Sequence, residues 1–499
     1  MKILSEIRVT FSGLISFIIS ISSIITGLIF TLIVTRRLTP DEFGTWTLLG
    51  GLITYVVIIE SIISIWTTRD IARGRDPGKT AFFFSGIFSM FGIGLYLLIA
   101  IFVAAQSSID LQPFLIATFL VPCMFLVRTL NSINYGHKPH AISFGLLGFE
   151  IVKIPIGLVL VYFLDLGISG AIITTIMAYM VNIFILLRFS IEKIKGKIKI
   201  SYLKKWLKLS WISVYPGLSN FVLSLDVSIY SVITGSVTGL AYIGVANTIS
   251  QIVGQSGKIS AGLYPKLLEG EKKEIIENNF TLMFYFAIPL TAFAITFARP
   301  GLFVLNPVYE IAIVVVWIMS IRVFIDAIGG IYSTVLTGLE KVDIEKKSTI
   351  RDYFKSKLFI VPTIRLIQFS SYVGILVIIF YLFLGNSNLE LVIYWSMISL
   401  ICQIFFTSTL GLIVRKKMTL HFDYKALTKY TISSIFIFGI SYLLMERFLI
   451  YEESIFVFIP NLIPFLVLVF SGYLGITYMI DENTRKLFKK IIKEISNKI

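Results

Sequence analysis

Uninterrupted apolar runs of about 20 residues recur along this chain from near its beginning to near its end. About 20 apolar residues in a helix cross a hydrocarbon core of about 30 Å with every backbone polar group satisfied internally. The runs do not alternate between polar and apolar residues, as the strands of a membrane barrel do. The chain is 56% hydrophobic and 15% charged, which is too little charge for the surface of a soluble protein of 499 residues. The sequence therefore predicts an all-α polytopic membrane protein.

The spacing of the runs predicts fourteen transmembrane helices. We place them at residues 10–35, 43–66, 81–105, 113–135, 141–164, 168–190, 209–234, 240–263, 279–299, 309–337, 358–384, 389–414, 430–449 and 455–480. The segments between them are too short to form an independent soluble domain. We therefore expect the protein to act within the bilayer.

The basic residues are distributed unevenly between the two sides of the predicted membrane. If both termini are cytoplasmic, only Arg36, Arg37, Arg299 and Arg447 of the 44 Lys and Arg residues fall in outer loops. Cytoplasmic loops of membrane proteins are enriched in Lys and Arg, and shifting the helix count by one would abolish this bias. We therefore expect a multi-pass protein of the cytoplasmic membrane with both termini inside. The net charge of +15 is then explained by its loops, without nucleic-acid binding.

Corresponding features recur about 200 residues apart, as in transporters built from duplicated bundles. The fourth and tenth helices carry Arg128 and Arg322, and the fifth and eleventh carry Lys153 and Arg365. We therefore predict two pseudo-symmetric lobes of six helices each, followed by two C-terminal helices. The predicted domains are residues 1–200 (helices 1–6), 201–420 (helices 7–12) and 421–499 (helices 13 and 14 with an amphipathic cytoplasmic tail).

Two basic segments also contain apolar residues. They are Lys193–Lys208 and the tail that begins at Arg485, in which apolar residues recur at helical spacing. Such helices lie in the headgroup region of a membrane. Two roles remain open, simple interfacial anchoring and contact with anionic lipids.

Four basic residues fall inside predicted helices, where a charge costs about 2.5–3.5 kcal/mol and needs a reason. Lys153 and Arg322 are placed near the midplane, whereas Arg128 and Arg365 can also extend their side chains toward the cytoplasmic face. Together they predict a cationic interior that suits an anion, and the planar fork of Arg suits phosphate. We therefore predict that all four bind substrate.

Acidic residues near these cations offer an alternative. Glu150 lies three residues before Lys153, and Asp326 lies four after Arg322, so each acid can instead neutralise a cation on the same helix face.

The candidate ion-coupling residues are Asp226, Asp326 and Glu60. Neither Asp226 nor Glu60 has a basic neighbour at helical spacing, and a carboxylate of this kind within a membrane can bind H⁺ or Na⁺. For Asp226 two alternatives remain, which are capping by Ser224 or Ser228 and exposure to water. The two cysteines and three histidines have no metal-ligand spacing, so we expect no metal site and no catalytic site.

The first predicted hairpin, Arg37–Trp46, resembles the R-x-L-x-P-x-x-F/Y-G turn of the polysaccharide transporter family, the Wzx-type O-antigen flippases. These flippases are relatives of the lipid II flippase and of the multidrug and toxin extrusion proteins, within the multidrug/oligosaccharidyl-lipid/polysaccharide exporter superfamily. The turn Leu166–Ala171 is similar to that family's turn into helix 6. Asp226, ahead of Gly235 and Gly244, is similar to the start of its second lobe.

This resemblance implies a two-lobed, V-shaped fold that works by alternating access. It also implies a cationic central cavity and a polyprenyl-diphosphate-linked oligosaccharide as substrate. We therefore expect a flippase, not an enzyme, in surface polysaccharide or glycoprotein biosynthesis, with no cofactor beyond a coupling H⁺ or Na⁺. The expected partners of this monomer are its lipid-linked substrate, membrane lipids and glycan assembly proteins, with no nucleic acid.

Two alternative functions remain open. A cation-coupled multidrug antiporter of the same superfamily would have an acidic cavity and normally twelve helices. A membrane-embedded glycan polymerase or glycosyltransferase would need catalytic groups on sizeable outer loops, and the predicted outer loops are short.

Overall fold

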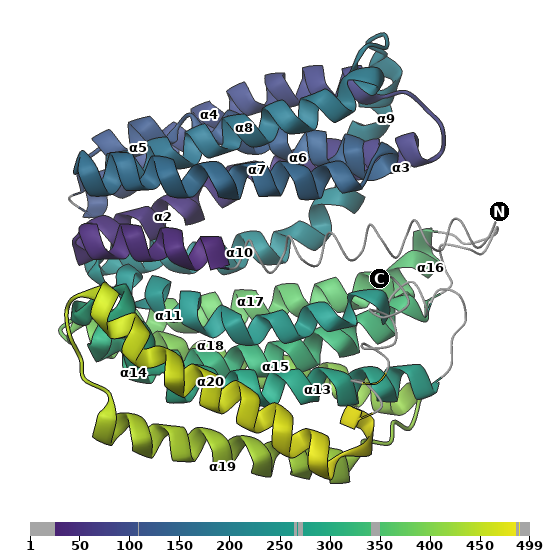
Figure 1. The fold of residues 1–499 in the computed structure, drawn as a ribbon. Coiled ribbons are helices and arrows are strands. Elements are labelled where there is room, and N and C mark those ends of the chain that lie inside the picture. Colours follow the sequence, from purple (N-terminus) through teal and green to yellow (C-terminus); the bar gives the residue numbers. More distant parts are fainter. Residues whose placement is uncertain are drawn as a thin grey trace. The chain divides into compact units, whose positions relative to one another are not determined.

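The computed structural model describes residues 25–485 except 108, 264–266, 268–272 and 341–349, and it also describes Lys489. These residues form helices and turns, without a β-strand among them (Figure 1). In chain order the first elements are α2 (Pro40–Val57), η1 (Ile58–Glu60), α3 (Ser61–Ala72), α4 (Gly78–Ser107), α5 (Gln112–Ala117), α6 (Leu120–His137), α7 (His140–Gly157), η2 (Leu158–Phe163), α8 (Gly167–Ile194), α9 (Ile200–Lys208) and α10 (Ser210–Thr234). The remaining elements are α11 (Thr238–Gly254), η3 (Gln255–Gly262), α13 (Lys273–Thr296), α14 (Ala298–Leu305), η4 (Pro307–Ala312), α15 (Ile313–Gly338), α16 (Ile350–Lys355), α17 (Lys357–Leu382), α18 (Asn388–Lys417), α19 (Tyr424–Phe448) and α20 (Ile455–Ile480).

Within this described part, twelve helical segments are long and apolar enough to cross a membrane, which confirms the predicted all-α polytopic fold. Each coincides with one of the fourteen predicted spans. The first predicted span, 10–35, begins outside the described residues, and residues 25–37 are helical. The eighth, 240–263, is α11 followed by the 3-10 segment η3, and it is not among the twelve. The predicted basic tail lies outside the described residues except for Arg485 and Lys489.

The start of α2 explains the hairpin sequence around Pro40. Thr39 caps the helix by accepting from the backbone of Glu42, whose carboxylate accepts from the backbone of Thr39 at 2.9 Å. This capping box satisfies amide groups that the first turn leaves without partners. A Cβ at Gly44 would overlap the carbonyl oxygen of Val237, so only glycine allows α2 to approach the start of α11 so closely. The turn therefore has a packing role.

The chain divides into two compact units. Unit 1 contains the described residues of Met1–Gly244 and Phe369–Asn388, and unit 2 contains those of Val245–Gln368 and Leu389–Ile499. Residues 201–244, which the sequence analysis assigned to the second lobe, thus group with unit 1. The division into lobes at residues 200 and 420 stays a prediction. Within unit 1, α8 packs against α6 and α7, and α10 packs against α2 (Figure 1).

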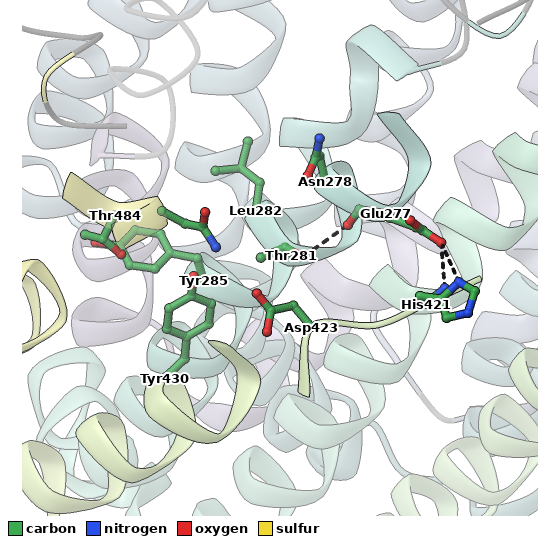
Figure 2. A pocket seen from close by; sticks show the side chains of 10 residues that line it. Glu277, Asn278, Thr281, Leu282, Tyr285, His421, Asp423, Tyr430 and Thr484 are labelled. Carbon is green, nitrogen blue, oxygen red and sulfur yellow. Dashed lines mark hydrogen bonds and ion pairs between the residues drawn. The ribbon is translucent and has the colours of Figure 1, made fainter. Parts of the chain in front are cut away.

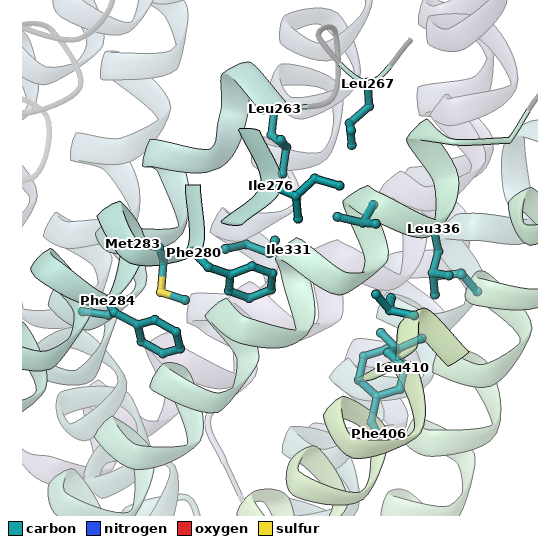
Figure 3. Packing of buried hydrophobic residues seen from close by; sticks show 14 residues of the cluster. Leu263, Leu267, Ile276, Phe280, Met283, Phe284, Ile331, Leu336, Phe406 and Leu410 are labelled. Atoms are coloured by element: carbon teal, nitrogen blue, oxygen red, sulfur yellow. The ribbon is translucent and has the colours of Figure 1, made fainter. Parts of the chain in front are cut away.

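The core of unit 2 is an aromatic and aliphatic cluster between α13, α15 and α18. Figure 3 shows Phe280, Met283 and Phe284 of α13 near Ile331 of α15, with Phe406 in the same cluster. Lipid tails are as apolar as these side chains, so burial alone does not favour helix association in a membrane. Interlocking side chains at close packing therefore hold these helices together.

Candidate functional site

Two of the predicted site residues line a polar cavity in unit 2. Arg322 and Asp326 are one turn apart on α15, and the cavity has a volume of about 310 Å³. Its other lining residues come from α11, η3 and α15: Gln251, Gly254, Gly257, Ser260, Val323, Ala327, Gly330, Ile331 and Thr334. Glycines and short polar side chains leave room there for a hydrated ligand.

Asp326 is also the meeting point of three helices. An Nη of Arg365 on α17 lies 3.7 Å from the Asp326 carboxylate, and the amide of Gln403 on α18 donates to it at 3.1 Å. Gln368 in turn donates to Gln403 at 3.0 Å. Gln403 is only 1% exposed, so its amide is held in place by packing. The network brings Arg322 and Arg365, 43 residues apart in sequence, to the same carboxylate region.

Arg322 retains hydrogen-bonding capacity. Its Nε is buried without a hydrogen-bond partner, and among the described residues it forms no ion pair. Arg322 therefore lines the cavity with donors still unused, while Arg365 pairs with Asp326. A guanidinium in a cavity with unused donors is suited to a planar anion such as phosphate.

Lys153 lies in unit 1 and has a different environment. Its Nζ is 2.7 Å from Glu150, and the two side chains are 9% and 8% exposed. Thr26 donates to the same carboxylate at 2.8 Å, and the Lys153 ammonium lies 4.8 Å from the ring centre of Phe149. This geometry matches the alternative in which Glu150 neutralises Lys153. A role for Lys153 in substrate binding stays a prediction.

Arg128 is exposed on α6. No ion pair involves it within the described part of the chain. This exposure is compatible with both interpretations of Arg128, a ligand for substrate and a side chain that reaches the membrane surface. Its predicted role therefore stays open.

Asp226 has a partner that sequence spacing did not indicate. The hydroxyl of Tyr372, in the C-terminal half of α17, donates to its carboxylate at 2.9 Å across 146 residues of sequence. Ser228, one of the two proposed capping residues, shares a hydrogen bond of 2.7 Å with Tyr55 of α2, whose hydroxyl also donates to the Ser224 carbonyl. In the sequence, the only indication of such contacts for Tyr372 and Tyr55 was the presence of a tyrosine inside an apolar span.

Glu60 is 1% exposed, at the 3-10 break between α2 and α3. Ser64 donates to its carboxylate at 2.6 Å, and Thr129 of α6 donates at 2.7 Å. Thr129 also lies within hydrogen-bond distance of Ser85 on α4, at 2.9 Å. No basic residue pairs with Glu60 in the part of the chain that the structure describes. The hydrogen bonds that described residues donate to this carboxylate thus come from hydroxyl groups.

A second polar pocket, of about 480 Å³, lies in unit 2 between α13, the start of α19 and the segment that follows α20. Figure 2 shows Glu277 bonded to His421, with Asp423 and Tyr430 nearby. The backbone amide of His421 donates to Glu277 at 2.6 Å, and the Lys273 ammonium is 3.4 Å from the same carboxylate. The two acids give this pocket no excess positive charge, so it does not suit an anion. The sequence analysis did not identify it.

Comparison with known proteins shows which solved structures share this fold. No protein-family model and no curated protein matches the sequence. Among solved structures, the chain is similar to one titled "Lipid II flippase MurJ, inward closed conformation" (TM-score 0.67, 14% identity, covering 95% of this chain and 100% of that one). It is also similar to an inward-facing multidrug resistance MATE family transporter of the MOP superfamily (TM-score 0.61, 14% identity, covering 82% and 96%).

A third similar structure is the Vibrio cholerae MATE transporter VcmN in its bent form (TM-score 0.51, 14% identity, covering 86% of this chain and 98% of that one). All three likenesses extend over most of both chains, and the described residues supply twelve apolar helices of spanning length. At these identities the likeness concerns the fold and not the substrate. The chain is a multi-pass membrane protein with the fold of the MOP-superfamily transporters.

Proposed function

We propose that this protein is a flippase that moves a polyprenyl-diphosphate-linked oligosaccharide from the cytoplasmic leaflet of the cell membrane to the outer leaflet. The observation that carries this proposal is the guanidinium of Arg322, with its buried and unused Nε donor, in a 310 Å³ cavity that also contains Asp326, the ion-pair partner of Arg365. The resemblance of Arg37–Trp46 to the Wzx-type turn supports the choice of substrate. The fold, shared with a lipid II flippase, supports the choice of mechanism.

The proposed mechanism needs no covalent chemistry. The sugar headgroup cannot cross hydrocarbon unaided, whereas the lipid tail can remain in the bilayer throughout. Arg322 binds the diphosphate with its unused donors, and the substrate displaces Asp326 from Arg365. Arg128 and Lys153 are candidates for further phosphate contacts during alternating access. Release on the outer side is favoured when Asp326 pairs with Arg365 again.

We further propose that the return step is coupled to H⁺ or Na⁺. Asp226 and Glu60 in unit 1 are the candidates, because both carboxylates are held by hydroxyl groups. Asp326 is a third candidate, since its charge already alternates between partners in the proposed cycle.

The deciding experiment is a gene deletion followed by measurement of the leaflet that holds lipid-linked oligosaccharide. We expect accumulation on the inner face, restored to normal by the wild-type gene. The variant Arg322→Glu should reach the membrane in normal amount but fail to restore transport. The variant Arg322→Lys should restore transport in part. The matched control, Arg447→Gln, should restore it fully. Normal transport by Arg322→Glu would remove this residue from the site. Unpolymerised units on the outer face would point instead to a glycan polymerase.

A cation-coupled multidrug antiporter is the second candidate function, favoured by the fold shared with MATE transporters. It predicts efflux of organic cations from cells or proteoliposomes, and the guanidinium of Arg322 in the cavity would repel such cations. Efflux that Arg322→Glu increases would favour this function over the flippase.

A further inference from the structure

The helix α9 is fixed to unit 1 by its inner face. Trp206 is fully buried and packs in one cluster with Ile63 and Trp66 of α3. Its indole Nε1 lies 3.3 Å from Asp70, a carboxylate that is 1% exposed, and Lys205 lies 3.1 Å from the same group. A buried carboxylate with these donors holds the helix in one orientation, so its opposite face is also fixed.

That opposite face has a regular composition. The exposed positions Ile200, Lys204 and Leu207 recur at intervals of four and three residues, so they lie on one side of α9. Trp211, also exposed, follows in the first turn of α10. Ser201 and Lys208 extend the same stripe. We call these six residues the α9 basic face.

The loop before α9 adds to this charge. Lys195, Lys197 and Lys199 are exposed there, with Ile198 between them. None of these lysines, nor Lys204 and Lys208, forms an ion pair with another described residue. Residues 195–211 contain no Asp or Glu. The surface therefore combines uncompensated positive charge with large apolar side chains.

We propose that the α9 basic face docks on the headgroup layer of a membrane that contains anionic phospholipid. Ile200, Leu207 and Trp211 enter the boundary of the acyl chains, and Lys204 and Lys208 remain at the level of the phosphates. The positive charge of this face favours binding to a negatively charged lipid surface. Its exposed apolar side chains favour a lipid membrane over a soluble acidic partner. This inference goes beyond the proposed flippase function and does not depend on which substrate is carried.

The test uses the full-length protein in vesicles. A spin label is attached at Ser201→Cys in a background of Cys123→Ser and Cys402→Ser, and its collisions with oxygen and with a water-soluble nickel chelate are measured. In vesicles of phosphatidylcholine mixed with phosphatidylglycerol we expect the label to shift toward oxygen and away from nickel, relative to phosphatidylcholine alone. High salt should reverse this shift, because it screens the attraction.

A charge variant and a matched control complete the design. The variant Lys197→Gln, Lys199→Gln, Lys204→Gln, Lys208→Gln should lose the shift. The control neutralises four other exposed cations, Arg415, Lys416, Lys417 and Lys425, and should keep it. Both keep the Asp70 contacts of α9, so folding of this region is unchanged. An equal shift in the two variants would overturn the proposal, and so would the absence of a response to phosphatidylglycerol. Immobilisation of the spin label that depends only on protein concentration would indicate contact with a second copy of the protein and would also overturn it.

Discussion

The Nζ of Lys153 lies 2.7 Å from the Glu150 carboxylate, and both side chains are more than nine-tenths buried in α7. Each charge makes the other tolerable in a region of low dielectric. If Lys153 contributes to phosphate binding, it must therefore exchange Glu150 for the substrate. A purely structural pair would need no such exchange, and the two roles lead to different outcomes on mutation.

We expect Lys153→Met to destabilise the protein by about 3–5 kcal/mol, because it leaves the Glu150 charge buried without its partner. The double variant Glu150→Gln, Lys153→Met should recover most of that loss. Thermal unfolding of the purified protein, followed by intrinsic fluorescence, measures both. If the double variant is stable but does not transport, Lys153 binds substrate. If it is stable and transports normally, the pair is structural.

Gly44→Ala should prevent the close contact between α2 and the start of α11. The added Cβ would overlap the Val237 carbonyl oxygen, which is backbone and cannot rotate away. Overpacking of this kind costs about 1–3 kcal/mol, so the melting temperature should fall. Gly50→Ala in the same helix is the matched control, because its Cβ would meet nothing within 4 Å. A melting temperature equal to that of wild type for Gly44→Ala would contradict the packing role.

The variants Glu60→Gln and Glu60→Ala should distinguish a structural role of Glu60 from a role in ion coupling. Glutamine keeps an oxygen for Ser64 and Thr129, so Glu60→Gln should fold with little loss of stability. Alanine removes the acceptor of the Ser64 hydroxyl and leaves the buried Thr129 hydroxyl with Ser85 as its remaining partner, which costs about 1–3 kcal/mol. If Glu60 carries the coupling ion, Glu60→Gln should also lose the dependence of transport on an H⁺ or Na⁺ gradient. Unchanged dependence in that variant would exclude Glu60.

Asp481, just beyond the end of α20, should give the protein an acid-sensitive contact. Burial disfavours its charged form, but hydrogen bonds from the amide and hydroxyl of Thr484 and from Tyr430, with Lys429 nearby, lower its pKa below the ordinary value of 3.8. A lowered pKa means that the carboxylate stabilises the fold above pH 3.8, and that this contribution is lost as the pH falls through the lowered value.

Asp481→Asn should therefore lower the melting temperature at pH 7, and the difference from wild type should shrink below a pH of about 4. Asp423→Asn is a useful control, because Asp423 instead caps α19 through the amide of Ala426. A difference between Asp481→Asn and wild type that is the same at both pH values would show that the Asp481 contacts do not depend on its charge.

Much of the fold could be predicted from local properties of the sequence. Within a bilayer a helix satisfies its own backbone, so an apolar run of sufficient length is enough to predict a span, and twelve predicted spans are confirmed. The pairing of Glu150 with Lys153 was also foreseeable as one alternative, because a spacing of three residues puts both on one face of a single helix.

The contacts between helices could not be predicted in this way. Helical spacing offered Arg322, on the same helix, as one possible partner of Asp326. In the structure the ion pair of Asp326 is with Arg365 of α17, and its hydrogen bond comes from Gln403 of α18. Likewise, only packing brings Tyr372 to Asp226. The sequence by itself determined which segments are helices and which charges lie in the membrane, because helix geometry is local. Tertiary structure decided which charges meet, since apolar faces of similar composition do not specify their neighbours until shape and hydrogen bonding select one packing.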